Sequence, residues 1–296
     1  MQVTMLSEVR ERPRRVAVGE FDGVHLGHRE VIRGSDTVLT FEPHPLQVIR
    51  PEAAPKLLTS LEAKAELISQ LGVEELVVIP FDQGFAHQSP QEFIDHVLVE
   101  RLEATRVSVG ENFRFGHRAA GDPAMLAADE RFETRVVPLV EVDGEIVSSS
   151  HIRGLVLAGE VEIATRFLGA PFQLRGEVVV GDQRGRTLGF PTANLVPDEA
   201  LVCPGHGIYA ARTSEACAAV SIGVRPTFGT GRALLVEAYL LDFEGDLYGQ
   251  TLRIDFLARL RGERRFESPE ALVEQMTRDI ELTRELCRGR DYEEDH

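Results

Sequence analysis

Val16-Ala-Val-Gly-Glu-Phe-Asp-Gly-Val-His-Leu-Gly-His28 is the segment that decides the fold of the first half of the chain. Its first three residues are apolar and predict a buried strand. Gly19, Gly23 and Gly27 follow, and they permit backbone conformations and close approaches that larger residues block. We therefore expect a compact ligand to bind at the turn after this strand.

Two histidines, His25 and His28, lie at the expected start of a helix in this segment. Both rings can face the helix N-terminus, where free N–H groups attract phosphate, and both can donate to phosphate oxygens. The alternative is that they only cap the turn. The pattern His-x-Gly-His directly after a strand resembles the signature of the nucleotidyltransferase superfamily, which has a Rossmann-like fold and transfers AMP or CMP from a nucleoside triphosphate.

Composition limits the rest of the molecule. The chain has 296 residues, 43% of them hydrophobic, which is enough for two domains of ordinary size. Its formal charge of −16 argues against nucleic acid as a substrate, because phosphate backbones require a basic surface. Lys56 and Lys64 are the only lysines, and no Gly-Lys-Ser/Thr phosphate loop occurs. Any phosphate site must therefore use arginine, histidine and backbone N–H groups.

The cysteines and the apolar runs indicate where the protein resides. Cys203, Cys217 and Cys287 are odd in number and widely spaced, which argues against a disulfide framework or a Cys-x-x-Cys zinc site. We expect reduced cysteines in the core. Residues 1–15 do not read as a signal peptide, and no run of about 18 apolar residues predicts a membrane span. A cytoplasmic protein without a membrane partner is expected.

The first half of the chain alternates strands with helices, which predicts a doubly wound parallel sheet. Capping boxes at 59–62 and 89–92 precede two of the helices. The helix after His28 is unusual, since it stops at about Arg33, and a helix of roughly six residues is only ~9 Å long. Val31 and Ile32 are its only apolar cover for the sheet, so part of the sheet is expected to be exposed.

Two further segments of this half carry candidate ligand contacts. In the loop after the strand at 106–109, Phe113 and Phe115 can stack on a flat ring and Arg114 can hold phosphate. The alternative is a charged surface loop anchored by one Phe. Later, Ser149 offers an oxygen at a helix start and Arg153 follows it, which predicts a second phosphate cradle.

Beyond Gly169-Ala-Pro171 the helical period disappears, and five or six strands predict a small antiparallel β-barrel followed by a helix from residue 268 to 287. The loop 181–194 carries the chemistry of this half. Gly181 and Gly189 suit a loop folded over phosphates, and Arg186 supplies charge. Thr192 and Asn194 present oxygen ligands for Mg²⁺. A flexible glycine turn is the alternative.

With Pro-Thr-Ala-Asn194 added to the histidine motif, the whole chain resembles the bacterial bifunctional riboflavin kinase/FMN adenylyltransferase family, also called FAD synthetase. The resemblance implies a Rossmann-like nucleotidyltransferase domain over residues 1–170, which adenylylates FMN to FAD and releases pyrophosphate. It implies a riboflavin kinase barrel over residues 171–296, which phosphorylates riboflavin with ATP.

The resemblance also implies residue roles. His25 and His28 are expected at the ATP phosphates of the first domain, with Thr192 and Asn194 as ligands of Mg²⁺–ATP and Glu237 as catalytic base in the second. The resemblance also places Asn112 in the ATP or metal environment of the first domain, and Ser149 and Arg153 at its phosphates. From the residue types alone, Phe113, Arg114 and Phe115 are the expected flavin contacts. The residue types likewise predict further ATP and phosphate contacts at Gly19, Phe21, Gly27, Gly181, Arg186 and Gly189.

Glu237 is also singled out by its surroundings. It is the only acidic or basic residue in the apolar strand from Ala233 to Leu241, where a buried carboxylate costs several kcal/mol. Desolvation is expected to raise its pKa toward neutrality, which suits a base that takes a proton from a ribityl hydroxyl. The alternative is a structural ion pair.

Two positions depart from the family pattern. Glu20 places a carboxylate where the family usually has a neutral residue, and Ser221 stands where Asn is common. Two other functions stay open: a riboflavin kinase whose first domain is impaired by the short helix, with FMN as the main product, and a non-catalytic flavin or nucleotide carrier. A carrier needs no base, so Glu237 argues against it.

Overall fold

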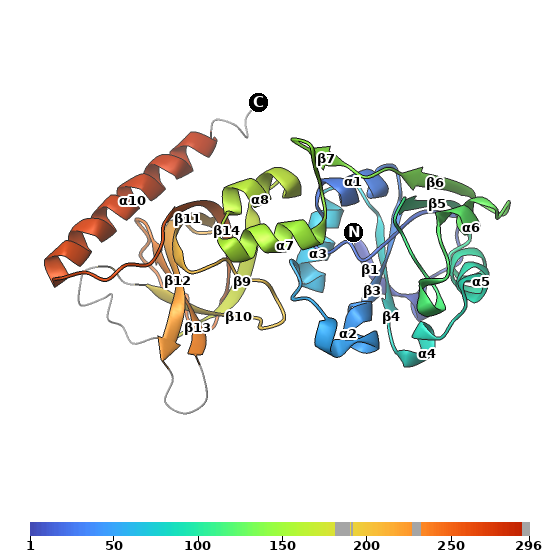
Figure 1. Ribbon diagram of the computed structural model, residues 1–296, viewed down its shortest axis with the longest axis horizontal. Helices are drawn as coiled ribbons and strands as arrows, with labels where there is room; N and C mark the ends of the chain where they lie inside the picture. The colour runs from blue at the N-terminus through green and yellow to red at the C-terminus, as the bar shows by residue number, and fades with distance from the viewer. Residues whose placement is uncertain (181–189, 191, 227–231, 292–296) are drawn as a thin grey trace. The chain divides into compact units, whose positions relative to one another are not determined.

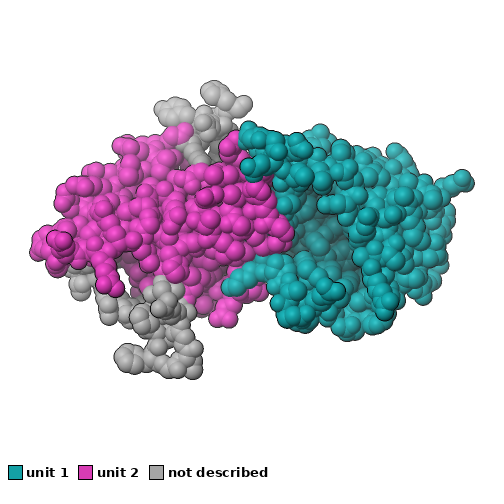
Figure 2. Space-filling model, viewed as in Figure 1, with its two compact units in different colours: residues 1–149 teal, residues 150–296 magenta. Residues whose placement is uncertain are grey.

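The computed structural model describes residues 1–180, 190, 192–226 and 232–291 (Figure 1). The chain forms two compact units, Met1–Ser149 and Ser150–His296, called unit 1 and unit 2 below (Figure 2). The division falls at the start of helix α7 (Ser149–Ala158), whereas the sequence predicted a boundary after helix α8 (Val161–Leu168). Both helices are thus counted with unit 2.

Unit 1 contains a six-stranded sheet in the order β1-β4-β3-β2-β5-β6, and every pairing in it is parallel, as predicted. From β2 the chain adds β3 and β4 on one side and β5 and β6 on the other, so the strand order reverses between β2 and β5. β1 was not predicted. The strands are β1 (Gln2–Met5), β2 (Arg14–Val18), β3 (Thr37–Glu42), β4 (Glu75–Pro80), β5 (Ala104–Gly110) and β6 (Glu133–Val137).

The helices of unit 1 are short and begin at defined caps. Ser89 and Glu92 form the predicted capping box, with the Ser89 N–H donating to Glu92 Oε2 at 2.7 Å. The other predicted box is shifted by one residue, because Ser60 caps α3. The helices are α1 (Leu26–Ile32), α2 (Pro45–Ile49), α3 (Leu61–Ser69), α4 (Gln83–Ala86), α5 (Pro90–Glu92) continued by a π-helix (Phe93–Arg101), and α6 (Pro123–Ala127); the 3₁₀ turns are Leu6–Glu8, Pro51–Ala53 and His117–Ala119.

Apolar cores cover both faces of the sheet, as a parallel sheet requires. The expectation that the short α1 leaves part of the sheet exposed is wrong. Ala17 and Val38, which share a core with Val31 and Ile32 of α1, are 0% exposed. Additional cover comes from two turn residues and from α3, namely Phe21, Val24 and Ile68.

Unit 1 ends in a small hairpin of β7 (Glu141–Val142) and β8 (Glu145–Ile146) around the predicted Asp143-Gly144 turn. Unit 2 is the predicted antiparallel barrel, closed in the order β10-β13-β12-β11-β14-β9. Its strands are β9 (Phe172–Val179), β10 (Ala193–Pro197), β11 (Gly207–Thr213), β12 (Cys217–Pro226), β13 (Arg232–Leu240) and β14 (Thr251–Arg261), and helix α10 (Pro269–Asp291) follows them.

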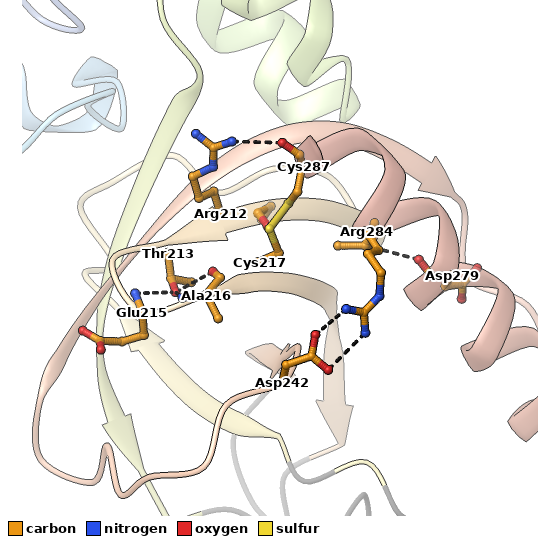
Figure 3. Close-up of a disulfide and its surroundings, with 11 residues drawn as sticks. Arg212, Thr213, Glu215, Ala216, Cys217, Asp242, Asp279, Arg284 and Cys287 are labelled. Atoms are coloured by element: carbon orange, nitrogen blue, oxygen red, sulfur yellow. Dashed lines mark hydrogen bonds and ion pairs between the residues drawn. A yellow bond between two sulfur atoms is a disulfide. The ribbon is translucent and has the colours of Figure 1, made fainter. Parts of the chain in front are cut away.

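Helix α10 packs against β11, β12 and β14 and is joined to the barrel by a disulfide between Cys217 and Cys287 (Figure 3). The expectation of reduced core cysteines is therefore wrong for this pair, while Cys203 is not part of a disulfide. The two cysteines are 70 residues apart in sequence, so spacing alone gave no signal for their pairing. Arg212 adds a hydrogen bond from Nη2 to the Cys287 carbonyl at 3.1 Å.

Candidate active sites

The first candidate site lies where the strand order reverses, at the carboxyl ends of β2 and β5. Ligands of open α/β sheets commonly bind at such a point. The turn after β2 is tightly packed: a Cβ on Gly19 would lie 3.1 Å from the Phe21 ring, and one on Gly27 would lie 3.2 Å from the His25 ring. Gly23 has φ +84°, which favours glycine. These glycines therefore serve packing and turn geometry.

Phe21, an expected ATP contact, is 1% exposed and lies in the core. Its ring meets the His28 ring edge-on, with centroids 5.3 Å apart. Phe21 and Val24 have φ values of 51° and 42°, in the left-handed region that non-glycine residues rarely adopt. Phe21 thus supports a histidine from behind instead of offering its ring to a ligand.

His25 and His28 are brought together by the start of α1. Their rings stack with centroids 3.5 Å apart, and the His28 N–H donates to His25 Nδ1 at 3.2 Å. This cap makes Nδ1 an acceptor, so a neutral His25 carries its proton on Nε2. Burial lowers the pKa of His25 to about 4. Burial, with the charges of His25 and Lys64, lowers the pKa of His28 well below its ordinary value. Both rings are therefore neutral donors at pH 7.

Ser149 is connected to the same turn. Its hydroxyl donates to the carbonyl oxygen of Asp22 at 2.9 Å. The Asp22 carboxylate accepts from the N–H groups of Leu58 and Thr59 at 2.8 and 3.1 Å, so it ties the turn to the segment before α3. Arg153 lies one turn into α7, in unit 2, and donates from Nη1 to Ser150 Oγ at 3.3 Å.

Glu20 lies beside a buried lysine that sequence reasoning missed. Burial raises the pKa of Glu20 to about 8, against the opposing effect of the Lys64 ammonium, and the nearby Asp22 and Glu42 raise it further. Glu20 is therefore mostly protonated at pH 7, and the extra negative charge expected beside the phosphate site is largely absent. Lys64 is 4% exposed and donates to Thr40 Oγ1 at 3.4 Å.

A sequence signal for Lys64 was available. It stands four residues before Ile68, which is 0% exposed, and therefore on the buried face of α3.

Of the three flavin contacts expected in the loop after β5, Phe113 and Arg114 are accessible to solvent and Phe115 is buried. Phe115 is 6% exposed and packs against Phe93 with ring centroids 5.4 Å apart, which leaves little of its ring open to a flavin. Phe113 is half-buried and stacks on Phe115 at 5.6 Å. Arg114 and Asn112 are exposed. The loop is thus anchored by one Phe and presents the other residues to solvent.

The second candidate site lies on the barrel wall. Asn194 of β10 and Ser221 of β12 are the direct neighbours of Glu237 on either side across the strands. Val236 and Ala238 are 0% exposed, which places them inside the barrel and Glu237 on the outer face. Glu237 is partly exposed there, so its expected burial is wrong. Its role as catalytic base stays a prediction.

Asn194 is 7% exposed, and Thr192 precedes it by two residues at the entry to β10. Amide, hydroxyl and carboxylate oxygens are the donor types that Mg²⁺ prefers, so the set of Thr192, Asn194 and Glu237 fits this ion chemically. In the described part of the chain, no group of three or more His, Cys, Asp or Glu residues could hold a metal by itself. The expected phosphate contacts Gly181, Arg186 and Gly189 lie outside the described residues.

Among the helices that the structure describes, none is long and apolar enough to cross a membrane.

Comparisons with known proteins match both halves of the chain. The family model for FAD synthetase matches residues 7–151, and the model for riboflavin kinase matches residues 168–287. The fold of the chain is also similar to that of a Streptococcus pneumoniae protein described as a macrolide-efflux protein, with a TM-score of 0.87 and 30% identity over 96% of this chain and 99% of that one.

Three similar relatives are named bifunctional riboflavin kinase/FMN adenylyltransferase. The Listeria monocytogenes protein is 39% identical over 91% of each chain, the Bacillus subtilis protein 38% over 89%, and the Escherichia coli K12 protein 34% over 95%. Two family models in chain order and relatives of this similarity over nearly the full length establish the assignment: the chain belongs to the bifunctional riboflavin kinase/FMN adenylyltransferase family.

Proposed function

We propose that the two activities of the family divide between the two units, with FMN adenylylated at the turn after β2 in unit 1 and riboflavin phosphorylated at Glu237 in unit 2. The chain is a bifunctional enzyme of flavin biosynthesis that uses ATP, riboflavin and FMN. The observation that carries the division is the stacked, neutral pair of His25 and His28 at the point where the strand order of the sheet reverses.

In adenylyl transfer, a phosphate oxygen of FMN attacks the α-phosphorus of ATP, and the bond from that phosphorus to the β-phosphate bridging oxygen breaks. The attacking phosphate is already ionised, so no base is needed. The step requires donors where charge builds up on the transferred phosphate and on pyrophosphate. His25 Nε2–H is fixed as a donor by the cap on Nδ1, and His28 is held against it. The two neutral N–H donors are therefore preorganised, because their orientation is fixed before the substrates react.

In the kinase half, Glu237 accepts the proton of the ribityl hydroxyl while the hydroxyl oxygen attacks the γ-phosphorus of ATP and ADP leaves. A carboxylate on the outer wall of the barrel can reach a bound substrate, whereas one inside the barrel could not. Asn194 and Thr192 would hold Mg²⁺, which would neutralise phosphate charge. The direct pairing of Asn194 with Glu237 supports one site for both roles.

The two other functions have less support. The impaired-adenylyltransferase alternative rested on an exposed sheet under α1, and Ala17 and Val38 are 0% exposed there. The carrier alternative does not explain why Glu237 lies beside Asn194, because a carrier needs no catalytic base.

A single assay with riboflavin, ATP and Mg²⁺, followed by separation of FMN from FAD, tests the division. The unaltered chain should form FAD. His28→Ala should accumulate FMN, because it removes a phosphate donor from unit 1 only. Glu237→Gln should lower riboflavin phosphorylation by about 10²-fold or more, yet still convert supplied FMN to FAD. Loss of both activities in either folded variant would contradict the assignment of two separate sites.

A further inference from the structure

Two arginines of the sheet hold the C-terminal end of α1. Arg135 of β6 donates from Nη1 to the carbonyls of Glu30 and Arg33, both at 3.0 Å. Arg106 of β5 donates from Nη2 to the carbonyl of Gly34, the residue after the helix cap. These carbonyls lie at the end of the helix, where carbonyl groups lack partners within the helix. We call Arg106 and Arg135 the arginine clamp.

The clamp comes from one face of the sheet. Ser108 pairs directly with Arg135, and Arg106 stands two residues before Ser108 on β5, so both arginines share a face. Helix α1 lies against β5 and β6 (Figure 1). Gly34 has φ +74°, and a Cβ there would lie 3.2 Å from Arg106 Nη2. The absence of a side chain at Gly34 therefore admits the guanidinium.

The positive charges of the arginine clamp lie at the C-terminal end of α1. The C-terminal end of a helix carries partial negative charge, and cations there are stabilising. Hydrogen bonds from a charged donor are shorter and roughly twice as strong as neutral ones. The clamp therefore attaches this helix end more firmly than apolar packing at Val31 and Ile32 alone.

A helix as short as α1 needs such an attachment. It has seven residues, and an isolated helix under about 12 residues is marginal in water. At ~1.5 Å per residue it is about 10 Å long, so movement of one end displaces the other by a similar amount. The other end carries His25 as its cap and His28 in its first turn. The helix therefore moves as a rigid body, and whatever fixes its C-terminal end also fixes its N-terminal end.

We propose that the arginine clamp is a positioning device for adenylyl transfer, in which Arg135 and Arg106 fix the C-terminal end of α1 and thereby the donors of His25 and His28. This inference rests on the role proposed above for the two histidines. A longer crossover helix is fixed by apolar packing along the sheet. In the short α1, hydrogen bonds from the two arginines take over this role. Both arginines act through the backbone of residues 30–34, which makes them positioning residues.

Three possible roles of the arginines, namely positioning, substrate binding and stability alone, predict different changes in kcat, KM and melting temperature. A misplaced donor lowers kcat, because a displacement near 1 Å costs about 10²-fold in rate. An arginine that binds ATP or FMN directly raises KM when it is removed. An arginine that serves stability alone lowers the melting temperature and leaves kcat unchanged at temperatures where the chain is folded.

The test uses the full chain with Arg135→Ala and Arg135→Lys, and Arg131→Ala as the matched control. Arg131 is an exposed arginine of unit 1, and its ion pairs are with Asp95 and Asp129, at 2.6 Å each, instead of with α1. FAD formation from FMN and ATP is measured well below the melting temperature. Riboflavin phosphorylation by the same chains reports on unit 2.

Arg135→Ala should lower kcat for FAD formation by about 10- to 100-fold with KM changed less than about twofold, and leave the kinase unchanged. Arg135→Lys keeps a cation at the helix end and should recover part of the loss, while Arg131→Ala should match the unaltered chain. In Arg135→Ala, NMR titration should show the pKa of His28 moving back toward its ordinary value, because its burial is reduced.

Three results would overturn the inference: an unchanged kcat in folded Arg135→Ala, a loss confined to KM, or a loss in Arg135→Lys equal to that in Arg135→Ala. If Arg135→Ala does not fold, Arg106→Ala carries the same measurement. The role of the histidines fails separately, since full FAD formation by His28→Ala would refute that role whatever Arg135→Ala does.

Discussion

Replacing Arg14 by methionine should destabilise unit 1 by about 3–5 kcal/mol, because a buried charge loses its partner. Arg14 is 1% and Glu75 6% exposed, and Nε lies 2.9 Å from Glu75 Oε2. The guanidinium also donates to the carbonyls of Arg10 and Arg12 at 2.8 Å each. Arg12 Nη2 lies 3.1 Å from the same Glu75 oxygen and remains in the variant, which places the expected loss near the lower value.

Heat inactivation of the two activities on the same chain measures this effect. A loss of ~3 kcal/mol in a unit of about 150 residues lowers its melting temperature by roughly 6–12 °C. FAD formation should be lost at a correspondingly lower temperature, while riboflavin phosphorylation keeps its profile. Arg14→Met/Glu75→Met removes both charges and should recover most of the loss. A shift under ~2 °C in the single variant, or a double variant less stable than the single one, would refute the reasoning.

Three other predictions concern the sites and the disulfide. Because the folded pKa of Glu20 is about 8, above its ordinary 4.5, its carboxyl ionises as pH rises from 7 to 9; FAD formation should fall over this range in the unaltered chain and not in Glu20→Gln. Phe115→Ala should cost about 3–5 kcal/mol of stability, whereas Phe113→Ala should raise KM for FMN with little effect on the melting temperature; equal melting temperatures would contradict this. Reducing the Cys217–Cys287 disulfide, whose 70-residue separation corresponds to ~4 kcal/mol of chain entropy, should lower the melting temperature of unit 2 only, and mass spectrometry without reductant should find no free thiol at either cysteine.

The layer architecture could be predicted because periodicity records which face of each element is buried. The alternation of strands and helices in the first half and the loss of the helical period after Pro171 gave the parallel sheet and the barrel. β1 was missed because four residues at a sheet edge, paired only with β4, carry no clear pattern. The pattern of one element cannot show a partner far away in sequence.

The candidate sites were harder to predict in detail because exposure depends on neighbours from other elements. Phe113 and Phe115 look alike in the sequence, and only Phe93 and the fold of the loop decide which of them is buried. Glu237 has apolar neighbours on both sides along its strand, yet Val236 and Ala238 point into the barrel and leave it on the outer wall. The same holds for the sheet face beside α1. It is covered in part by Phe21 and by α3, which lie outside α1 itself.

The two sheets differ in how they end. The six described strands of unit 2 close into a barrel, so none of them is an edge strand to which another chain could add. The open sheet of unit 1 ends in β1 and β6 (Figure 1). In β1, Val3 is 51% and Met5 36% exposed. In a crowded cell or a concentrated preparation, strand addition from a neighbouring molecule would begin at an edge of this sheet, and the FAD-forming half would be the first lost to aggregation.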